Sequence, residues 1–495
     1  MKRGDMNQPS IKKNYIYRLA YEILNLIVPF ITAPYISRIL GAEGIGIYSY
    51  TGSVMSYFTL AAALGTSSYG TREIARCRSN KKEASKIFWE IEWIMVFTTS
   101  VCLAAWTGVI MFSRQYRCYY IALFPALLAK MFDISWFFAG LEKMKSIVIP
   151  NILCKSGGIV LLFWFVKEKE DLILYILIHT GTILLGNLSM WLYLPGMVQK
   201  AEIKTLGFKG HFHEIIIYFI PTVATSIYTV LDKTLIGMIT NDHYQNGCYE
   251  QAVKIISIVK TIVFAAINSV MGARISYLFA KQKYAEIHQR VELSMNIILF
   301  LGYGCVFGMV GIAKTFVPFF LGDGYEQVVI LLYIMSPLIL IIGISNCLGS
   351  QYFTPSGQRR RSAKVILFGA VLNLCVNLLL IPRFGANGAA AASVLAETMI
   401  SIIYVRMCDG YITVSFLAKA SWKRVTAAFL MCGVISFLGK SITGWGLWIL
   451  TVQIIVGIML YSTVLLFMKD DAILYFLKSV WDMNRQKKGK GYGKA

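Results

Sequence analysis

Residues 325–348 read YEQVVILLYIMSPLILIIGISNCL, an apolar run that contains a single charged side chain, Glu326. A run of about 20 apolar residues is long enough to cross the hydrocarbon core of a bilayer as an α-helix. Thirteen further runs of this kind follow one another through the chain of 495 residues, separated by short gaps. The pattern predicts an all-α polytopic membrane protein with about fourteen transmembrane helices, whose function lies between the helices.

The composition supports a membrane protein and excludes several other classes. Hydrophobic residues make up 57% of the chain and charged residues 15%, whereas soluble domains contain about 25% charged residues. A net charge of +22 can indicate nucleic-acid binding. We nevertheless expect no nucleic-acid partner, because no basic patch is interleaved with stacking aromatic residues. The ten cysteines form no CxxC pair, so we expect neither a disulfide framework nor a metal site, and no cofactor. The first apolar run is too long for a cleavable signal peptide.

The basic residues gather in alternate gaps between the apolar runs. If the N-terminus faces the cytoplasm, the cytoplasmic gaps hold the basic clusters within 72–86, 274–290 and 359–364. Cytoplasmic loops of membrane proteins carry an excess of Lys and Arg. The sequence therefore predicts a multi-pass membrane protein with both termini in the cytoplasm.

A weak internal likeness suggests two related halves. Pro29 and Pro34 precede the glycine-containing stretch 41–48, and Pro221 precedes a similar stretch at 236–249. Transporters are commonly built from paired repeats with the substrate site between them. We predict an N-terminal bundle at 1–200, a C-terminal bundle at 210–408, two accessory helices at 423–468 and a basic cytoplasmic tail at 469–495.

Several charged residues fall inside the apolar runs, where each costs at least about 2.5–3.5 kcal/mol on insertion scales. Three pairs have the spacing of neighbours on one helix face: Arg18 with Glu22, Lys130 with Asp133, and Glu250 with Lys254. Asp232 and Lys233 are adjacent and point about 100° apart around a helix. These pairs either fix the packing of the helices or take part in transport.

Four other charges have no partner at helical spacing: Arg38, Lys155, Lys260 and Glu397. At 1.5 Å per residue, Lys130, Lys155 and Lys260 come near the middle of the membrane. We interpret them as lining a water-filled cavity that accepts an anionic substrate. The candidate substrate-binding residues are Arg38, Lys130, Lys155, Lys233, Lys254 and Lys260. The candidates for coupling or structural ion pairs are Arg18, Glu22, Asp133, Asp232, Glu250 and Glu397. No catalytic residue is expected.

Four strings carry a resemblance to a known family: PYISRILG at 34–41, DISWFFAGLEK at 133–143, YTVLDKTLIG at 228–237 and IPRFGANGAA at 381–390. They resemble the corresponding helices, in the same order, of Wzx-type polysaccharide flippases. These belong to the multidrug/oligosaccharidyl-lipid/polysaccharide exporter superfamily. The resemblance implies two six-helix bundles around a central cavity, with two further C-terminal helices.

The resemblance also implies a function. A flippase of this family moves an undecaprenyl-diphosphate-linked repeat unit to the outer leaflet by alternating access, for O-antigen, capsule or exopolysaccharide. It implies the lipid-linked oligosaccharide, the bilayer, and a polysaccharide polymerase with chain-length machinery as partners. Transport could be coupled to the membrane potential or to a proton or sodium gradient, with Asp133 and Glu397 as candidates.

Three alternatives remain. A multidrug antiporter of the same fold would favour unpaired carboxylates over lysines in its cavity. A lipid II flippase would also bind a diphosphate, but the string DISWFF argues against it. A membrane polymerase or ligase of sugar repeats would need a large external catalytic loop, and the gaps in this chain are short.

Overall fold

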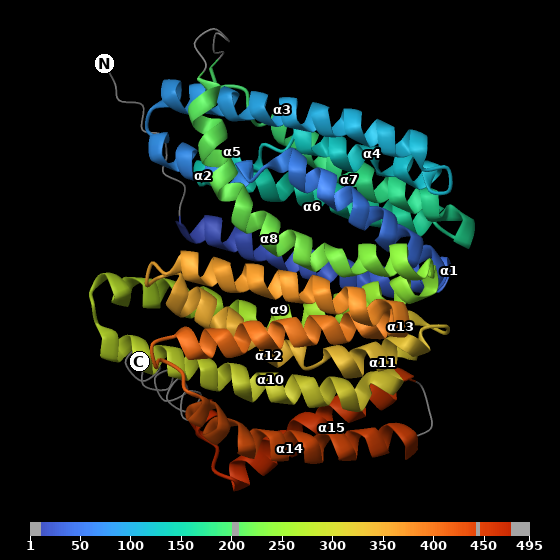
Figure 1. Cartoon of the computed structure of the whole chain (residues 1–495), viewed down its shortest axis with the longest axis vertical. Coiled ribbons are helices and arrows are strands. Elements are labelled where there is room, and N and C mark those ends of the chain that lie inside the picture. The colour runs from blue at the N-terminus through green and yellow to red at the C-terminus, as the bar shows by residue number, and fades with distance from the viewer. Residues whose placement is uncertain (1–10, 200–206, 442–445, 477–495) are drawn as a thin grey trace, which may run out of the picture. The chain divides into compact units, whose positions relative to one another are not determined.

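The computed structural model describes residues 11–199, 207–441 and 446–476, and these ranges contain helices and no strand (Figure 1). Ten helical stretches are long and apolar enough to cross a membrane. Two of them, Leu19–Cys77 with 59 residues and Arg359–Met407 with 49, are long enough for two passes each. With α8 (Phe208–Thr240) and α9 (His243–Ala280), the described helices accommodate fourteen passes. The predicted all-α polytopic class is therefore confirmed.

The chain divides into two compact units, Met1–Gly247 and Cys248–Ala495. The first contains α8 and the following helices: α1 (Ile11–Ala63), α2 (Thr66–Cys77), α3 (Lys81–Phe112), α4 (Arg117–Met131), α5 (Ser135–Gly140), α6 (Lys145–Phe165), η1 (Lys169–Asp171) and α7 (Leu172–Trp191). Because α8 packs on α1, α2 and α3, this unit extends beyond the predicted boundary near residue 210. The predicted functional halves stay a prediction.

The second unit is built from the rest of α9 and from six further helices and a π-helical segment. They are α10 (Tyr284–Leu321), α11 (Glu326–Met335), α12 (Leu338–Leu348), η3 (Gly349–Phe353), α13 (Arg359–Met407), α14 (Val414–Ser441) and α15 (Gly446–Phe467). The predicted accessory helices correspond to α14 and α15, which pack on α10. Residues 477–495, most of the predicted basic tail, lie outside the described residues.

Two glycines bend the longest helices. Gly41 in α1 has φ 67° and ψ 176°, and Gly385 in α13 has φ 54° and ψ −132°. Residues with a Cβ rarely adopt such positive φ values, whereas glycine does so readily. Each glycine therefore lets one continuous stretch turn between two passes, within the strings PYISRILG and IPRFGANGAA.

Two other glycines allow a close crossing in the first unit. A Cβ atom at Gly46 would lie 1.7 Å from the carbonyl oxygen of His243, and one at Gly247 would lie 1.9 Å from that of Ala42. Small residues let membrane helices approach at backbone distance. The two stretches that look alike in sequence, after Pro34 and after Pro221, thus contact each other directly.

Candidate functional site

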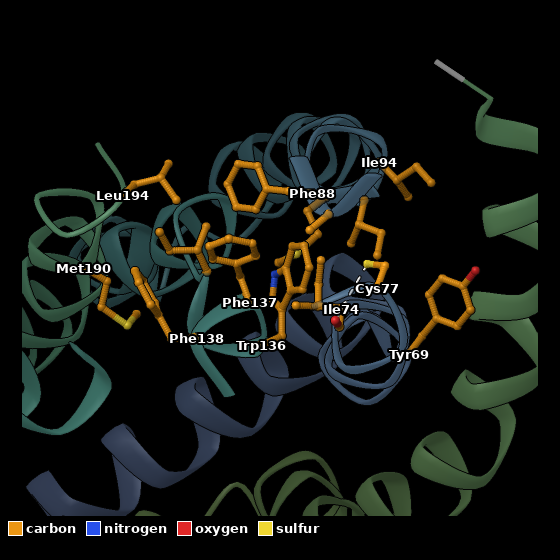
Figure 2. Close-up of a cluster of buried hydrophobic side chains, with 14 of the residues drawn as sticks. Tyr69, Ile74, Cys77, Phe88, Ile94, Trp136, Phe137, Phe138, Met190 and Leu194 are labelled. Atoms are coloured by element: carbon orange, nitrogen blue, oxygen red, sulfur yellow. Dashed lines mark hydrogen bonds between the residues drawn. The ribbon is translucent and has the colours of Figure 1, made fainter. Parts of the chain in front are cut away.

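The string DISWFF forms a packed core at one end of the first unit. α4 ends at Met131, and α5 then carries Trp136, Phe137 and Phe138, all buried. Figure 2 shows Trp136 and Phe137 pointing toward Phe88 of α3, with ring centroids 5.7 and 4.9 Å from that of Phe88. This core fixes the end of α4 and therefore the position of the charged residues beside it.

Glycines make room for the aromatic side chains of this core. A Cβ atom at Gly70 of α2 would lie 2.4 Å from the Trp136 ring, and one at Gly140 would lie 2.7 Å from Ile74. Interiors packed to this density tolerate no added methyl group without movement. The aromatic part of the string is thus structural, whereas Asp133 at its start is polar and partly exposed.

Lys130 and Asp133 form an ion pair as predicted, but they do not share a helix face, because α4 ends at Met131 and Asp133 lies in the turn that follows it. Lys130 Nζ lies 3.8 Å from Asp133 Oδ2, and the two side chains are 33% and 24% exposed. Asp133 also accepts a hydrogen bond from the backbone N–H of Ser135 at 3.2 Å. The ammonium group is therefore close to its counter-ion and still partly exposed.

Lys155 on α6 is held by neutral groups of α1. Its ammonium donates a hydrogen bond to Asn25 Oδ1 at 2.5 Å and lies 5.2 Å from the centroid of the Tyr21 ring. An amide oxygen and an aromatic face stabilise a cation without neutralising it. These partners of Lys155 carry no negative charge, and sequence spacing could not indicate partners some 130 positions away.

The second unit contains two further cations of the candidate set. Lys254 Nζ lies 3.3 Å from Glu250 Oε1, which is the predicted pair on α9. The Glu397 carboxylate of α13 acts electrostatically on Lys260 of α9. Sequence spacing does not pair Lys260 with Glu397, and the fold brings them near each other.

The remaining candidates lie in the first unit. Arg38 and Glu22 lie exposed on α1, and each has an interaction partner. The side chain of Arg18 is not among those that the structure describes. Asp232 of α8 is buried and acts electrostatically on Tyr57 of α1. The backbone carbonyl of Lys233 accepts a hydrogen bond from Asn246 Nδ2 at 2.9 Å.

Two carboxyl groups of α3 were missed by the sequence argument, although the segment EIE at 90–92 interrupts an apolar run. Glu90 binds His211 Nε2 at 2.9 Å and accepts from the backbone N–H of Gly207 at 2.6 Å, which ties the start of α8 to α3. Tyr69 Oη lies 2.6 Å from His211 Nδ1. Glu92 is buried on the same helix. Within the described ranges no group of three or more His, Cys, Asp or Glu residues could hold a metal ion.

Fold and site together define a multi-pass, all-α membrane protein with lysines inside its spanning segments. The lipid II flippase MurJ in an inward closed conformation has this fold, with a TM-score of 0.65 at 16% identity over 93% of this chain and 99% of that one. An inward-facing multidrug resistance MATE family transporter of the MOP superfamily gives 0.59 at 14% identity, over 82% and 99%. These likenesses confirm the fold.

The chain belongs to the polysaccharide biosynthesis protein family, whose model matches residues 11–277. A protein of Escherichia coli (strain K12) named "Putative O-antigen transporter" is 24% identical over 415 residues, which cover 81% of this chain and 98% of that protein. The four strings resemble those of polysaccharide flippases, and the family match and this relative confirm that resemblance.

Proposed function

We propose that this protein flips an undecaprenyl-diphosphate-linked oligosaccharide from the cytoplasmic to the outer leaflet, by alternating access through a cationic cavity, for surface polysaccharide biosynthesis. The observation that carries the proposal is Lys155, a cation inside a spanning segment whose described partners are neutral. A lysine inside a spanning segment whose partners are not anions favours a role in binding an anionic ligand. The family, and the transporter and flippase names of its relatives, support a lipid-linked saccharide as that ligand.

The lysines would act on the diphosphate and leave the lipid tail in the bilayer. Charge interactions are stronger in a site that excludes water than in bulk water. Lys155 would bind a phosphate oxygen without first breaking an ion pair. Lys130 would exchange its 3.8 Å contact with Asp133 for a phosphate oxygen. The sugars would then follow the diphosphate into the cavity as the two halves rock about it.

The cellular setting follows from the same proposal. The protein would lie in the inner or plasma membrane of a bacterium with both termini in the cytoplasm, as the basic loops favour. It would deliver repeat units to a polysaccharide polymerase and chain-length machinery. The buried aromatic residues of the string DISWFF would hold α5 and the end of α4 in place during transport.

Deleting the gene should abolish surface polysaccharide, while lipid-linked repeat units accumulate on the cytoplasmic leaflet. Both are measured by extracting surface polymer and lipid-linked saccharides from the same cells. Normal polymer length and amount, in a strain without a second homologue, would contradict the proposal. Normal polymer combined with raised sensitivity to cationic drugs would favour the multidrug antiporter.

Replacing Lys155 or Lys260 by alanine should reduce transport per folded molecule roughly tenfold or more, because a hydrogen bond to a charged group is worth about 1.5–3 kcal/mol. Replacement by arginine keeps the charge and should preserve part of the activity. Surface polysaccharide is measured relative to the folded protein in the membrane. Lys364→Ala, at an exposed lysine of α13, is the control and should stay near wild type. Near-normal transport by Lys155→Ala and Lys260→Ala would remove these lysines from the site.

A further inference from the structure

Glu92 is a buried acidic side chain that has no counter-ion and no hydrogen bond within the described part of the chain. It is 2% exposed, and neither carboxyl oxygen has a hydrogen-bond partner among the described residues. The indole N–H of Trp136, in the aromatic core that packs on α3, is also buried and has no hydrogen-bond partner among the described residues. Glu90, two positions earlier, is by contrast bound by His211 and Gly207. An ionised carboxylate at Glu92 would be strongly disfavoured, because burying an unpaired charge costs several kcal/mol.

Among the described residues, the charged group that acts on Glu92 is Asp133, which itself belongs to an ion pair. The Asp133 carboxylate lies 3.8 Å from the ammonium group of Lys130. The α4 helix carries one other charged residue, Arg117, at its opposite end. Glu92 therefore experiences the negative charge of Asp133, reduced by Lys130.

The other helices that pack on α3 bring their charges elsewhere. Residues 90 and 92 lie about 200° apart around α3, so the groups that surround Glu90 belong to the opposite face. His211 of α8 and Lys86 of α3 lie 2.9 and 3.8 Å from the Glu90 carboxylate oxygens. Glu73 and Arg76 of α2 and Glu214 of α8 act electrostatically on Tyr69, as Glu90 does. The half of α1 that follows Gly41 contacts α3 through the hydrogen bond from Thr98 to the Ala62 carbonyl, and its one charged residue, Glu43, is at its far end.

We propose that Glu92 is a proton-binding residue of the first unit and that its proton occupancy depends on whether Lys130 neutralises Asp133. While the Lys130–Asp133 pair is closed, Glu92 faces little net charge. When Lys130 moves away, Asp133 acts on Glu92 with its full negative charge, and a like charge nearby favours the neutral, protonated form of a carboxyl group. The proton comes from water and returns to it, and no covalent bond other than O–H changes.

This inference deepens the proposed function and rests on it for its role in transport. If a diphosphate draws Lys130 from Asp133, binding of the substrate and binding of a proton favour each other. Such linkage is reciprocal by thermodynamic necessity. The proton site would then let a proton gradient bias the binding and release of the lipid-linked saccharide.

The test measures the proton on Glu92 directly, without substrate. We expect the infrared spectrum of the purified full-length protein in lipid nanodiscs at pH 7 to contain the C=O stretch of a protonated carboxyl group. Glu92→Gln should lose this band, and the matched control Glu90→Gln, on the same helix, should keep it. An identical band in wild type and Glu92→Gln would overturn the proposal.

The dependence on Lys130 is tested with the same band. In Lys130→Gln, which stands for a lysine that has left Asp133, the band should persist to a higher pH than in wild type, by about one unit. An unchanged titration would overturn the linkage. Glu92→Gln should fold as well as wild type, because the carboxyl group has no hydrogen bond to lose, and size-exclusion chromatography checks this.

The outcomes separate this inference from the proposed function. The infrared measurement uses protein without a saccharide lipid, so a failed polysaccharide assay would leave the Glu92 site standing. Absence of the band would conversely leave flipping by the lysines standing, without a proton at Glu92.

Discussion

Replacing Arg424 by alanine is expected to lower the free energy of unfolding by about 3–5 kcal/mol and to remove much of the folded protein from the membrane. The guanidinium group is 1% exposed and donates to the two carboxylate oxygens of Asp470 at 3.0 and 3.3 Å. It also donates to the backbone and side-chain oxygens of Asn296 on α10, each at 3.1 Å. The alanine variant leaves the buried Asp470 carboxylate without a counter-ion, which loosens α14 and the segment after α15 from α10.

The measurement is thermal unfolding of the purified protein, together with its abundance in the membrane. Arg359→Ala, at an exposed arginine of α13, is the matched control and should unfold at nearly the wild-type temperature. Replacing Arg424 and Asp470 together by apolar residues should recover part of the loss, since no charge is then left unpaired. Equal stability of the Arg424→Ala and Arg359→Ala variants would show that this pair does not anchor the two C-terminal helices.

Replacing Gly46 by alanine should destabilise the first unit by about 3 kcal/mol or more, at the upper end of the range for overpacked sites. The new Cβ atom would lie 1.7 Å from the His243 carbonyl oxygen and 2.6 Å from its carbon. Both atoms belong to the backbone, so no side-chain rotation can relieve the clash. The α1 helix and the start of α9 would have to separate, which would also lengthen the 3.4 Å contact between Ser49 and Asn246.

Replacing Gly108 of α3 by alanine is the matched control, and it should leave the stability unchanged or raise it. A Cβ atom there meets nothing within 4 Å, and alanine is favoured over glycine inside a helix by roughly 0.5–1 kcal/mol. Thermal unfolding of both variants should therefore show a lower midpoint for Gly46→Ala and an unchanged or higher one for Gly108→Ala. A midpoint for Gly46→Ala that matches wild type would mean that the crossing of α1 and α9 is not close-packed in the folded protein.

The sequence alone determined those properties that depend on neighbouring residues. Apolar runs such as 325–348 define spanning helices because a bilayer selects for length and hydropathy. The pair Glu250–Lys254 followed from helical spacing, since residues three or four apart share a face. The pair Lys130–Asp133 was predicted in the same way and forms although α4 ends at Met131, between the two residues. The family followed from short strings such as DISWFF, and its model indeed matches residues 11–277.

Only the tertiary structure decided which helices meet. Lys155 donates a hydrogen bond to Asn25, and Arg424 donates to Asp470, across long separations in sequence. Glu397 acts electrostatically on Lys260 across a similarly long separation. Among the described residues, Glu92 has no hydrogen-bond partner, whereas Glu90 on the same helix is bound by His211. In a soluble helix an apolar stripe marks the buried face, but a membrane helix is apolar on its lipid-facing and protein-facing sides alike. The sequence pattern therefore determines how many helices this chain has, and close packing in three dimensions determines their neighbours.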